Sequence, residues 1–229
     1  KTLGKARTRL AGLSIMKFSF STKSYSQETI LLPLTLTLTK GEIIVLMGQS
    51  GSGKTTLLKL IAGLEKDDHQ NAKSTLKIGM MFQEPRLLPW KTVQENIEVA
   101  GPIDHLLKDL DLEDAGALYP RQISLGMARR VALARALASK PELLLLDEPL
   151  GALDLKLRRQ MQIELKWIQT EVGLTFVHVT HDQEEAMTMA DTIAVMNEGR
   201  IEQMGSPTEL YDNPKTVFVA NFLGQSNLI

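Results

Sequence analysis

The feature that most constrains this 229-residue chain is a glycine-rich octapeptide, Gly48-Gln49-Ser50-Gly51-Ser52-Gly53-Lys54-Thr55. It follows a continuous apolar run over residues 43–47, which is typical of a strand buried on both faces. It precedes a helical pattern over residues 55–62 that ends at Gly63. Glycines let such a loop turn so that successive N–H groups point inward at an anion. The strand, loop and helix together predict an α/β fold with a phosphate-binding loop.

A glycine, four residues and then Gly-Lys-Thr is a pattern typical of loops that hold nucleotide phosphates. Lys54 is expected to reach the β- and γ-phosphates, and the Thr55 hydroxyl is expected to bind Mg²⁺. The N-terminus of the following helix also attracts anions. The alternative is a glycine-rich turn followed by an unrelated lysine. The expected nucleotide-binding residues of this segment are Gly48, Gln49, Ser50, Gly51, Ser52, Gly53, Lys54, Thr55 and Thr56.

Two adjacent acids follow a second apolar run. Residues 143–146 are all leucine, and Asp147 and Glu148 come directly after them. A strand in a parallel sheet delivers its carboxyl end to the ligand crevice. Asp147 is therefore expected to hold Mg²⁺, directly or through water, and Glu148 to act as general base on the attacking water. The alternative is a strand that runs out into a solvated acidic turn.

The rest of the chain alternates between apolar runs and helical patterns. A short strand is predicted at residues 78–82 and a third buried strand at 174–179, and apolar residues at helical spacing predict a helix over 155–172. Strands in alternation with helices predict an α/β fold with a mostly parallel sheet.

Two segments predict antiparallel strands beside that sheet. Residues 32–38 alternate leucine with other residues at a period of two, as in a strand with one buried face. Residues 193–196 and 200–204 flank Asn197-Glu198-Gly199, which predicts a hairpin. An antiparallel flank is therefore expected.

Residues from about 84 to 140 contain no apolar strand. Thr92 followed three residues later by Glu95 predicts a capped helix start. Ser124 is expected to cap a longer helix that stops before Pro141. We predict that this segment is a helical subdomain inserted into the nucleotide-binding core.

Composition excludes several classes of site. The chain has no cysteine, which excludes disulfides, zinc–thiolate sites and a cysteine nucleophile. A net charge of -1 gives no basic bias toward nucleic acid. No stretch approaches the ~18–20 apolar residues of a membrane helix, so a membrane role would go through a partner. Residues 1–15 are expected to be a flexible extension, and residues 16–229 a single domain.

Further motifs occur in a fixed order between and after the loop and the acidic pair. They are Phe82-Gln83-Glu84-Pro85, Ile123-Ser124-Leu125-Gly126-Met127, Gly151-Ala152-Leu153-Asp154 and Val179-Thr180-His181-Asp182. Over about residues 16–225 the chain resembles the ABC ATPase family, with these motifs as its Q-loop, signature, D-loop and switch-histidine loop. Tyr25 lies about where that family places an aromatic residue that stacks on adenine. The resemblance implies a P-loop NTPase core of the RecA-like type, with ATP and Mg²⁺ as ligands.

The resemblance also implies a site shared between two copies. One subunit would supply Lys54, Thr55, Gln83, Asp147, Glu148 and His181, and the other Ser124 and Gly126. Gln83 would sense the γ-phosphate and Mg²⁺, and His181 would be the switch histidine. Each residue has an alternative: Gln83 as a solvated polar residue, His181 as a structural histidine, Ser124 as a helix cap only, and Tyr25 as a surface tyrosine.

As an ABC transporter subunit, the chain would power a permease. ATP would close a homodimer and hydrolysis would release it. The expected partners are an integral-membrane permease and, indirectly, an extracytoplasmic substrate-binding protein, and the expected location is the cytoplasmic face of the inner membrane. Leu88-Pro89-Trp90 resembles importers of nitrate, sulfonate and taurine-like anions, whereas residues 202–211 and 218–224 resemble polyamine, sugar and iron importers. The two hints disagree, so the substrate stays open.

The signature departs from the family pattern at one position. Leu125 stands where the family has a glycine that approaches the γ-phosphate held by the other subunit. One alternative is therefore a catalytically weak ATP-binding partner subunit. A second is a soluble, non-transport ABC ATPase, although the chain has neither a long coiled-coil insertion nor a second cassette.

Overall fold

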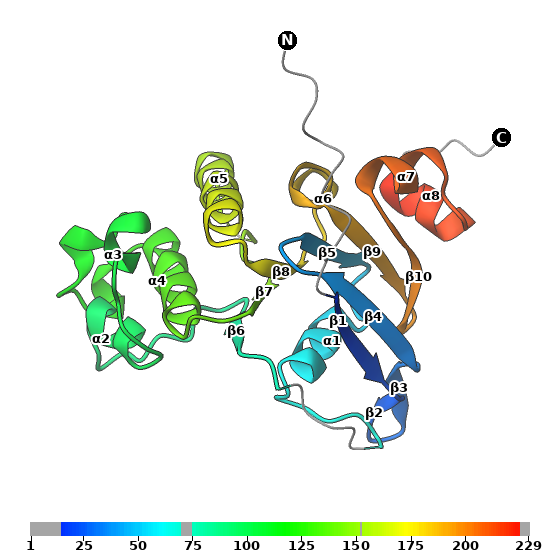
Figure 1. The fold of residues 1–229 in the computed structure, drawn as a ribbon, viewed down its shortest axis with the longest axis horizontal. Helices are drawn as coiled ribbons and strands as arrows, with labels where there is room; N and C mark the ends of the chain where they lie inside the picture. The colour runs from blue at the N-terminus through cyan, green and yellow to red at the C-terminus, as the bar shows by residue number, and fades with distance from the viewer. Residues whose placement is uncertain (1–14, 70–74, 152, 225–229) are drawn as a thin grey trace, which may run out of the picture.

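The structure is a computed structural model that describes residues 15–69, 75–151 and 153–224. Its centre is a six-stranded sheet in which all neighbouring strands except one pair run parallel (Figure 1). In spatial order the strands are β10 (Arg200–Gly205), β9 (Thr192–Asn197), β5 (Ile43–Gly48), β8 (Thr175–Val179), β7 (Leu143–Asp147) and β6 (Ile78–Met81). Only the pairing of β9 with β10 is antiparallel within this sheet, and it forms the predicted hairpin.

The sheet is buried on both faces because its central strands are apolar at nearly every position. All residues of β5, β7 and β8 are buried. The period of two divides β5 between the two faces: Ile43, Val45 and Met47 join one apolar cluster, and Ile44 and Leu46 join the other. Continuous apolar runs therefore correctly predicted strands covered from both sides.

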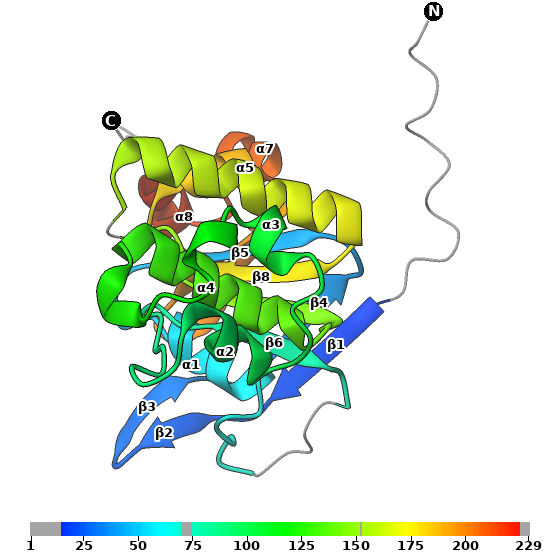
Figure 2. The same ribbon diagram turned by 90° about the vertical axis from the view of Figure 1, so that its left-hand side faces the viewer.

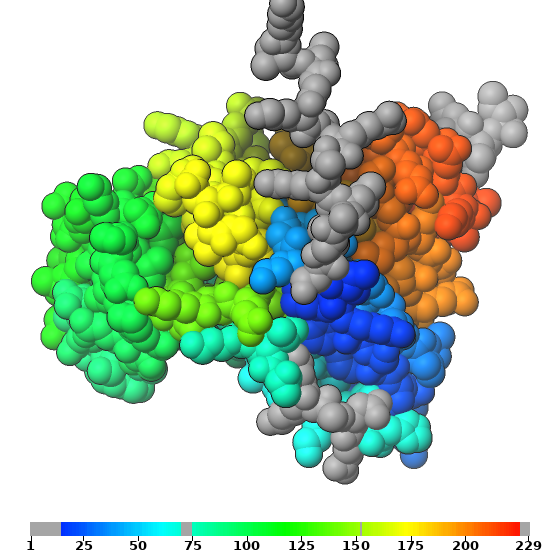
Figure 3. Space-filling model, viewed as in Figure 1, coloured from blue at the N-terminus to red at the C-terminus, as the bar shows by residue number. Residues whose placement is uncertain are grey.

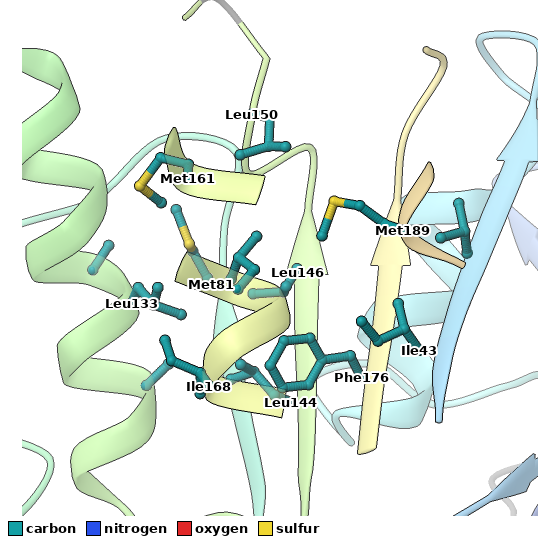
Figure 4. Close-up of a cluster of buried hydrophobic side chains, with 14 of the residues drawn as sticks. Ile43, Met81, Leu133, Leu144, Leu146, Leu150, Met161, Ile168, Phe176 and Met189 are labelled. Atoms are coloured by element: carbon teal, nitrogen blue, oxygen red, sulfur yellow. The ribbon is translucent and has the colours of Figure 1, made fainter. Parts of the chain in front are cut away.

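Helices cover the two faces. On one face α5 (Leu155–Val172) contributes Met161 and Ile168 to a cluster with Phe176 of β8, as Figure 4 shows. On the other face α1 (Lys54–Ile61) contributes apolar residues of its buried side. The helix α6 (Gln183–Met189) follows β8 (Figure 1), and α7 (Pro207–Asp212) and α8 (Val217–Leu223) follow β10 (Figures 1 and 2).

Two short antiparallel sheets flank the core. β1 (Ile15–Phe20) pairs with β4 (Leu34–Thr39), and β2 (Lys23–Tyr25) pairs with β3 (Glu28–Leu31). The alternation in β4 buries Leu36 and Leu38 and exposes Thr35 and Thr37. The single strand predicted over residues 32–38 was wrong at its start, because the chain leaves β3 at Leu31 and resumes at Leu34. Pro33 lies in this break, since it has no N–H to donate to a strand pair.

The segment between β6 and β7 consists of short helices around one long helix. It contains α2 (Val93–Glu98), α3 (Leu106–Asp109) and α4 (Leu125–Ala138), and it forms the left-hand lobe in Figures 1 and 3. Thr92 and Glu95 make the predicted reciprocal capping box at the start of α2. The Ser124 hydroxyl caps α4 by accepting a hydrogen bond from the Met127 N–H at 3.2 Å. That this lobe is a subdomain of its own stays a prediction.

The expected extension, residues 1–15, lies outside the described residues except for Ile15, which begins β1. Within residues 15–69, 75–151 and 153–224, no helix combines the length and the apolar character that a membrane crossing requires.

Candidate functional site

The phosphate loop connects the carboxyl end of β5 to the start of α1. Two of its glycines are required by close packing. A Cβ on Gly48 would lie 2.2 Å from the Met196 carbonyl oxygen, and one on Gly53 would lie 2.5 Å from the Leu31 side chain. Gly53 also has a φ of 96°, a left-handed conformation that favours glycine. The loop is therefore held against β9 and β3 by residues without side chains.

Lys54 folds back into this loop. Its Nζ donates hydrogen bonds to the carbonyl oxygens of Gly48 and Gln49, both at 2.8 Å, and lies 3.4 Å from the Ser52 hydroxyl. The side chain is buried, and burial lowers the pKa of Lys54, although the nearby carboxylates of Asp147 and Glu148 oppose that effect. A buried ammonium bonded to neutral oxygens gains strongly from an anion, so its position favours phosphate binding.

A hollow of about 290 Å³ opens beside the loop. Its lining residues are all predicted site residues except Ile30. The lining consists of Tyr25, Ile30, Ser50, Gly51, Gly53, Lys54, Thr55, Thr56 and Glu148. The structure therefore brings the aromatic residue of β2, the phosphate loop and the second acid into one place.

Tyr25 is the aromatic member of this hollow and is 41% exposed. Its hydroxyl donates to Glu65, and the Lys23 ammonium lies 4.7 Å from the ring centroid. Burial and the bond to Glu65 raise the pKa of Tyr25. The ring is thus fixed at its hydroxyl end and partly open to the solvent.

Two oxygen ligands suited to Mg²⁺ are adjacent. The Thr55 hydroxyl donates to Oδ1 of Asp147 at 3.1 Å, which joins the start of α1 to the end of β7. Asp147 is 5% exposed, and burial raises its pKa. A hydroxyl and a carboxylate are the hard oxygen donors that Mg²⁺ prefers. These residues fit a magnesium ion at the phosphate loop.

Glu148 lies where the carboxyl ends of three neighbouring strands come together. Gln83 follows β6 and donates its Nε2 to Oε2 of Glu148 at 2.9 Å. His181 follows β8, and its Nδ1 lies 3.3 Å from Oε1 of Glu148. Because β8, β7 and β6 are adjacent and parallel, their carboxyl ends bring these three side chains together. Both oxygens of the predicted base are therefore held by the predicted partners.

Glu148 itself has an unusual backbone. Its φ is 46°, in the left-handed region that residues with a Cβ rarely adopt. Its N–H donates to the Val179 carbonyl at 3.0 Å, and its own carbonyl accepts from the Gly151 N–H at 3.2 Å. Strained backbone of this kind persists only where the surroundings fix it, and it is concentrated at functional sites.

Ser124 and Gly126 lie apart from this group, at the start of α4 in the lobe. Neither lines the hollow beside the phosphate loop. A Cβ on Gly126 would lie 2.4 Å from the Leu157 side chain, so this glycine lets α4 approach α5. Leu125 between them is 50% exposed. The two predicted clamp residues do not meet the phosphate loop of their own chain.

A buried polar network behind Glu148 was missed by sequence reasoning. Nε2 of His178 lies 2.5 Å from Oε1 of Glu185, and the Thr180 hydroxyl donates to the other Glu185 oxygen at 2.9 Å. Thr180 in turn accepts from the Asp182 N–H at 3.0 Å, and Arg158 donates to the Asp182 carboxylate at 2.8 Å. The hydrogen bonds of Thr180 and Asp182 hold the loop that carries His181. The only sequence signal was the repeated appearance of polar residues next to a buried strand.

Comparison with known proteins agrees with this geometry. A profile of the ABC transporter family matches residues 31–151. The spermidine/putrescine import ATP-binding protein PotA of Thermobifida fusca is 48% identical over 86% of this chain and 57% of that protein. PotA proteins of Acetivibrio thermocellus and Salmonella typhi are each 44% identical, over 94% and 99% of this chain and 68% and 66% of those proteins. The chain thus spans between 57% and 68% of the length of these relatives.

Solved structures give the same result. One neighbour is the dimeric ATP-binding cassette MJ0796, bound to ADP and Pi in a post-hydrolysis state. It is 31% identical to this chain in sequence, and the two structures match with a TM-score of 0.74 over 84% of this chain and 99% of that chain. The cassette cbiO1 of Clostridium perfringens, part of the ABC transporter complex cbiONQ, is 26% identical with a TM-score of 0.75 over 88% and 91%. These neighbours confirm the predicted α/β fold with its mostly parallel sheet and antiparallel flank. The chain belongs to the family of ABC transporter ATP-binding proteins.

Proposed function

We propose that this chain binds and hydrolyses ATP and so powers the import of a substrate through a membrane permease. The observation that carries the proposal is the buried Lys54 ammonium, which is bonded to loop carbonyls and lines one hollow with Thr55, whose hydroxyl is bonded to Asp147. A cation held in this way needs an anion, and the neighbouring oxygens suit a divalent metal. The relatives named as import ATP-binding proteins, and a structural neighbour that holds ADP and Pi, support the same activity.

Each side chain has a part in the proposed reaction. Lys54 and the N–H groups of the loop bind the terminal phosphates, and Tyr25 contacts the base. Thr55, Asp147 and Gln83 would hold Mg²⁺, which when bound neutralises charge that develops on the phosphates. Glu148 orients the attacking water and accepts its proton, while Gln83 and His181 keep both carboxylate oxygens in place.

The proposed active form is a dimer of two facing copies. Ser124 and Gly126 lie outside their own hollow, so they are free to contact a nucleotide held by the partner. A ligand contacted by both copies favours the closed dimer over the open one, because it binds the closed state more tightly. The dimeric neighbour MJ0796 supports this arrangement.

The substrate class that the relatives support is the polyamines, of the spermidine and putrescine type. The pattern over residues 202–211 and 218–224 agrees with this choice, and the anion-importer hint at Leu88-Pro89-Trp90 does not. The permease and an extracytoplasmic binding protein would select the substrate, and this chain would work on the cytoplasmic face of the inner membrane. The named relatives do not favour a soluble, non-transport ATPase.

The activity is tested by Lys54→Ala. Loss of the buried ammonium should weaken ATP binding by about 100-fold, because a charged partner of the phosphates is removed. A titration with a fluorescent ATP analogue measures this. Lys40→Ala, which removes an exposed lysine before β5, should leave the affinity unchanged. Equal affinity in all three proteins would overturn the assignment of the phosphate loop.

The transport role is tested with the permease. We expect the chain to co-purify with the permease of a polyamine importer and to support uptake of labelled spermidine in proteoliposomes supplied with ATP and Mg²⁺. Chelation of Mg²⁺ should stop both uptake and hydrolysis. Hydrolysis without any permease-dependent uptake would overturn the transport role while leaving the ATPase assignment intact.

A further inference from the structure

Arg129 on α4 contacts the backbone that directly follows β7. Its Nη1 donates to the Glu148 carbonyl oxygen at 3.1 Å and also to the Pro149 carbonyl oxygen. The residue is 4% exposed, and burial lowers its pKa, with the Glu148 carboxylate opposing that effect. An arginine of the helical lobe thus reaches the backbone of the proposed general base.

The bonding of this arginine differs from that of its neighbour. Arg130 is also buried, and it forms an ion pair with Glu164 at 2.7 Å. Within the described residues, Arg129 has no carboxylate within ion-pair distance, whereas the Nε atoms of both arginines have no hydrogen-bond partner. The Glu148 carboxylate attracts Arg129 only from beyond that distance, and a buried charge without a paired carboxylate is costly, so ordinary ion pairing does not explain why α4 buries Arg129.

The two carbonyls that Arg129 binds belong to the strained turn. Glu148 has its φ at 46°, and such a conformation needs bonds from several sides to persist. The bonds to Val179 and from Gly151 come from the sheet side and from within the turn. Arg129 supplies the bonds from the lobe, and a guanidinium is suited to this because its donors are in a rigid plane.

We propose that Arg129 is a positioning residue that holds the Glu148 turn, and through it the Glu148 carboxylate, in the orientation that hydrolysis requires. The inference rests on the proposed role of Glu148 as general base. It also gives α4 two roles. The helix begins after Ser124, which is proposed to contact the partner's nucleotide, and five residues later it holds the base of its own site. A shift of α4 is thereby transmitted to Glu148.

The first test compares Arg129→Met with Arg130→Met in the full-length chain. Arg129→Met removes the donors to the turn, so kcat for ATP should fall about 10- to 100-fold while KM changes by less than about twofold, as expected when a reacting group is misplaced. Arg130→Met leaves the half-buried Glu164 without its partner and should lower Tm at least as much, but it should keep kcat. Equal losses of kcat in the two variants, or normal kcat in Arg129→Met, would overturn the proposal.

A conservative variant separates positioning from folding. Arg129→Lys keeps a charged three-proton donor only one bond shorter than Nη1, so it should recover a large part of the kcat that Arg129→Met loses. It also serves as the test variant if Arg129→Met does not fold. A kcat as low in Arg129→Lys as in Arg129→Met, with both proteins folded, would contradict a role through these hydrogen bonds.

A double-mutant cycle identifies the residue through which Arg129 acts. Single-turnover hydrolysis is measured for Glu148→Gln with and without Arg129→Met. If Arg129 acts through the carboxylate, the second change should cost little on this background. A full additional loss would overturn the proposal. Normal turnover in Glu148→Gln alone would instead overturn the proposed base, so the two failures are distinguishable.

Discussion

The two sides of the proposed nucleotide site are built in different ways. On the loop side, Lys54 and Thr55 are consecutive residues between β5 and α1, and they lie in one hollow with Glu148. On the lobe side, Ser124 and Gly126 lie on a helix inserted between β6 and β7, outside that hollow. One copy therefore contains a complete phosphate cradle but not the clamp that would close over it. The difference teaches that changes at Lys54 or Thr55 should affect nucleotide binding in a single copy, whereas changes at Ser124 or Gly126 should affect the nucleotide site only in the dimer.

The largest effect is expected on the loop side, from Glu148→Gln. Glutamine keeps the size of the side chain and can still contact Gln83 and His181, but it cannot accept the proton of the attacking water. Turnover should fall by about 10²- to 10⁴-fold with ATP affinity retained. The unhydrolysed ATP should hold the two copies together, which light scattering after gel filtration would detect. Near-normal turnover would mean that another group is the base.

Asp147→Asn, also on the loop side, should lower turnover but raise the stability of the protein. The loss of one metal-binding carboxylate should lower Mg²⁺-dependent turnover by about 100-fold. Burial raises the pKa of Asp147, so the folded state disfavours its charged form. Asparagine removes that charge and can still accept the Thr55 hydrogen bond. The variant should therefore be more stable than the parent at neutral pH, in the absence of nucleotide.

The sign of this stability effect depends on pH. A carboxyl with a raised folded-state pKa favours folding below its unfolded value of about 3.8, and this contribution is lost as the pH rises through the folded-state pKa. The gain in Tm from Asp147→Asn should therefore be larger at pH 7 than near pH 4. Thermal unfolding at the two pH values measures it. A lower Tm for the variant at pH 7 would contradict the assigned cost of burying this charge.

A smaller effect is expected on the lobe side, from Ser124→Ala. Removal of the cap on α4 should cost about 1 kcal/mol of stability. Ser206 provides a matched control, because its hydroxyl accepts from the Glu209 N–H at 3.2 Å, the same distance as in the Ser124 cap. Both alanine variants should lose similar stability, but only Ser124→Ala should lower turnover, by about tenfold. ATP affinity at concentrations where the chain is monomeric should be unchanged. Equal turnover in the two variants would reduce Ser124 to a helix cap.

The same two sides differ in how far the sequence predicts them. β5, the loop and α1 were predicted because their signals are local: an apolar run, glycines at fixed spacing and a helical period. Glu148 was predicted from the leucine run before it, which is again a local signal. Gln83 and His181 were named only from the family resemblance, and their contacts to Glu148, across 65 and 33 residues, are set by the order of the parallel strands and were not predicted.

The lobe was predicted less completely. The caps at Thr92 and Ser124 have local signals and were found, whereas α3, with its four residues, has no marked apolar period. The burial of Arg129 could not be predicted, because arginine is ordinarily exposed and its carbonyl partners are 19 and 20 residues away in the sequence. The buried pair of His178 and Glu185 was also missed: the two residues are close in sequence, but the turn between β8 and α6 that brings them to 2.5 Å has no marked signal of its own.

The smallest effect is expected from Leu125→Gly, which tests whether the lobe side is weakened. Leu125 is 50% exposed at the start of α4, and its side chain is not among those that line the hollow of its own chain. If the partner's nucleotide is contacted by Ser124 and the backbone at Gly126, the leucine side chain can point away from it. Substitution at an exposed site typically changes energies by about 0.5 kcal/mol or less, so permease-coupled turnover should change by less than about threefold. A large rise in turnover would instead show that Leu125 obstructs the clamp and that this leucine makes the chain a weak ATPase.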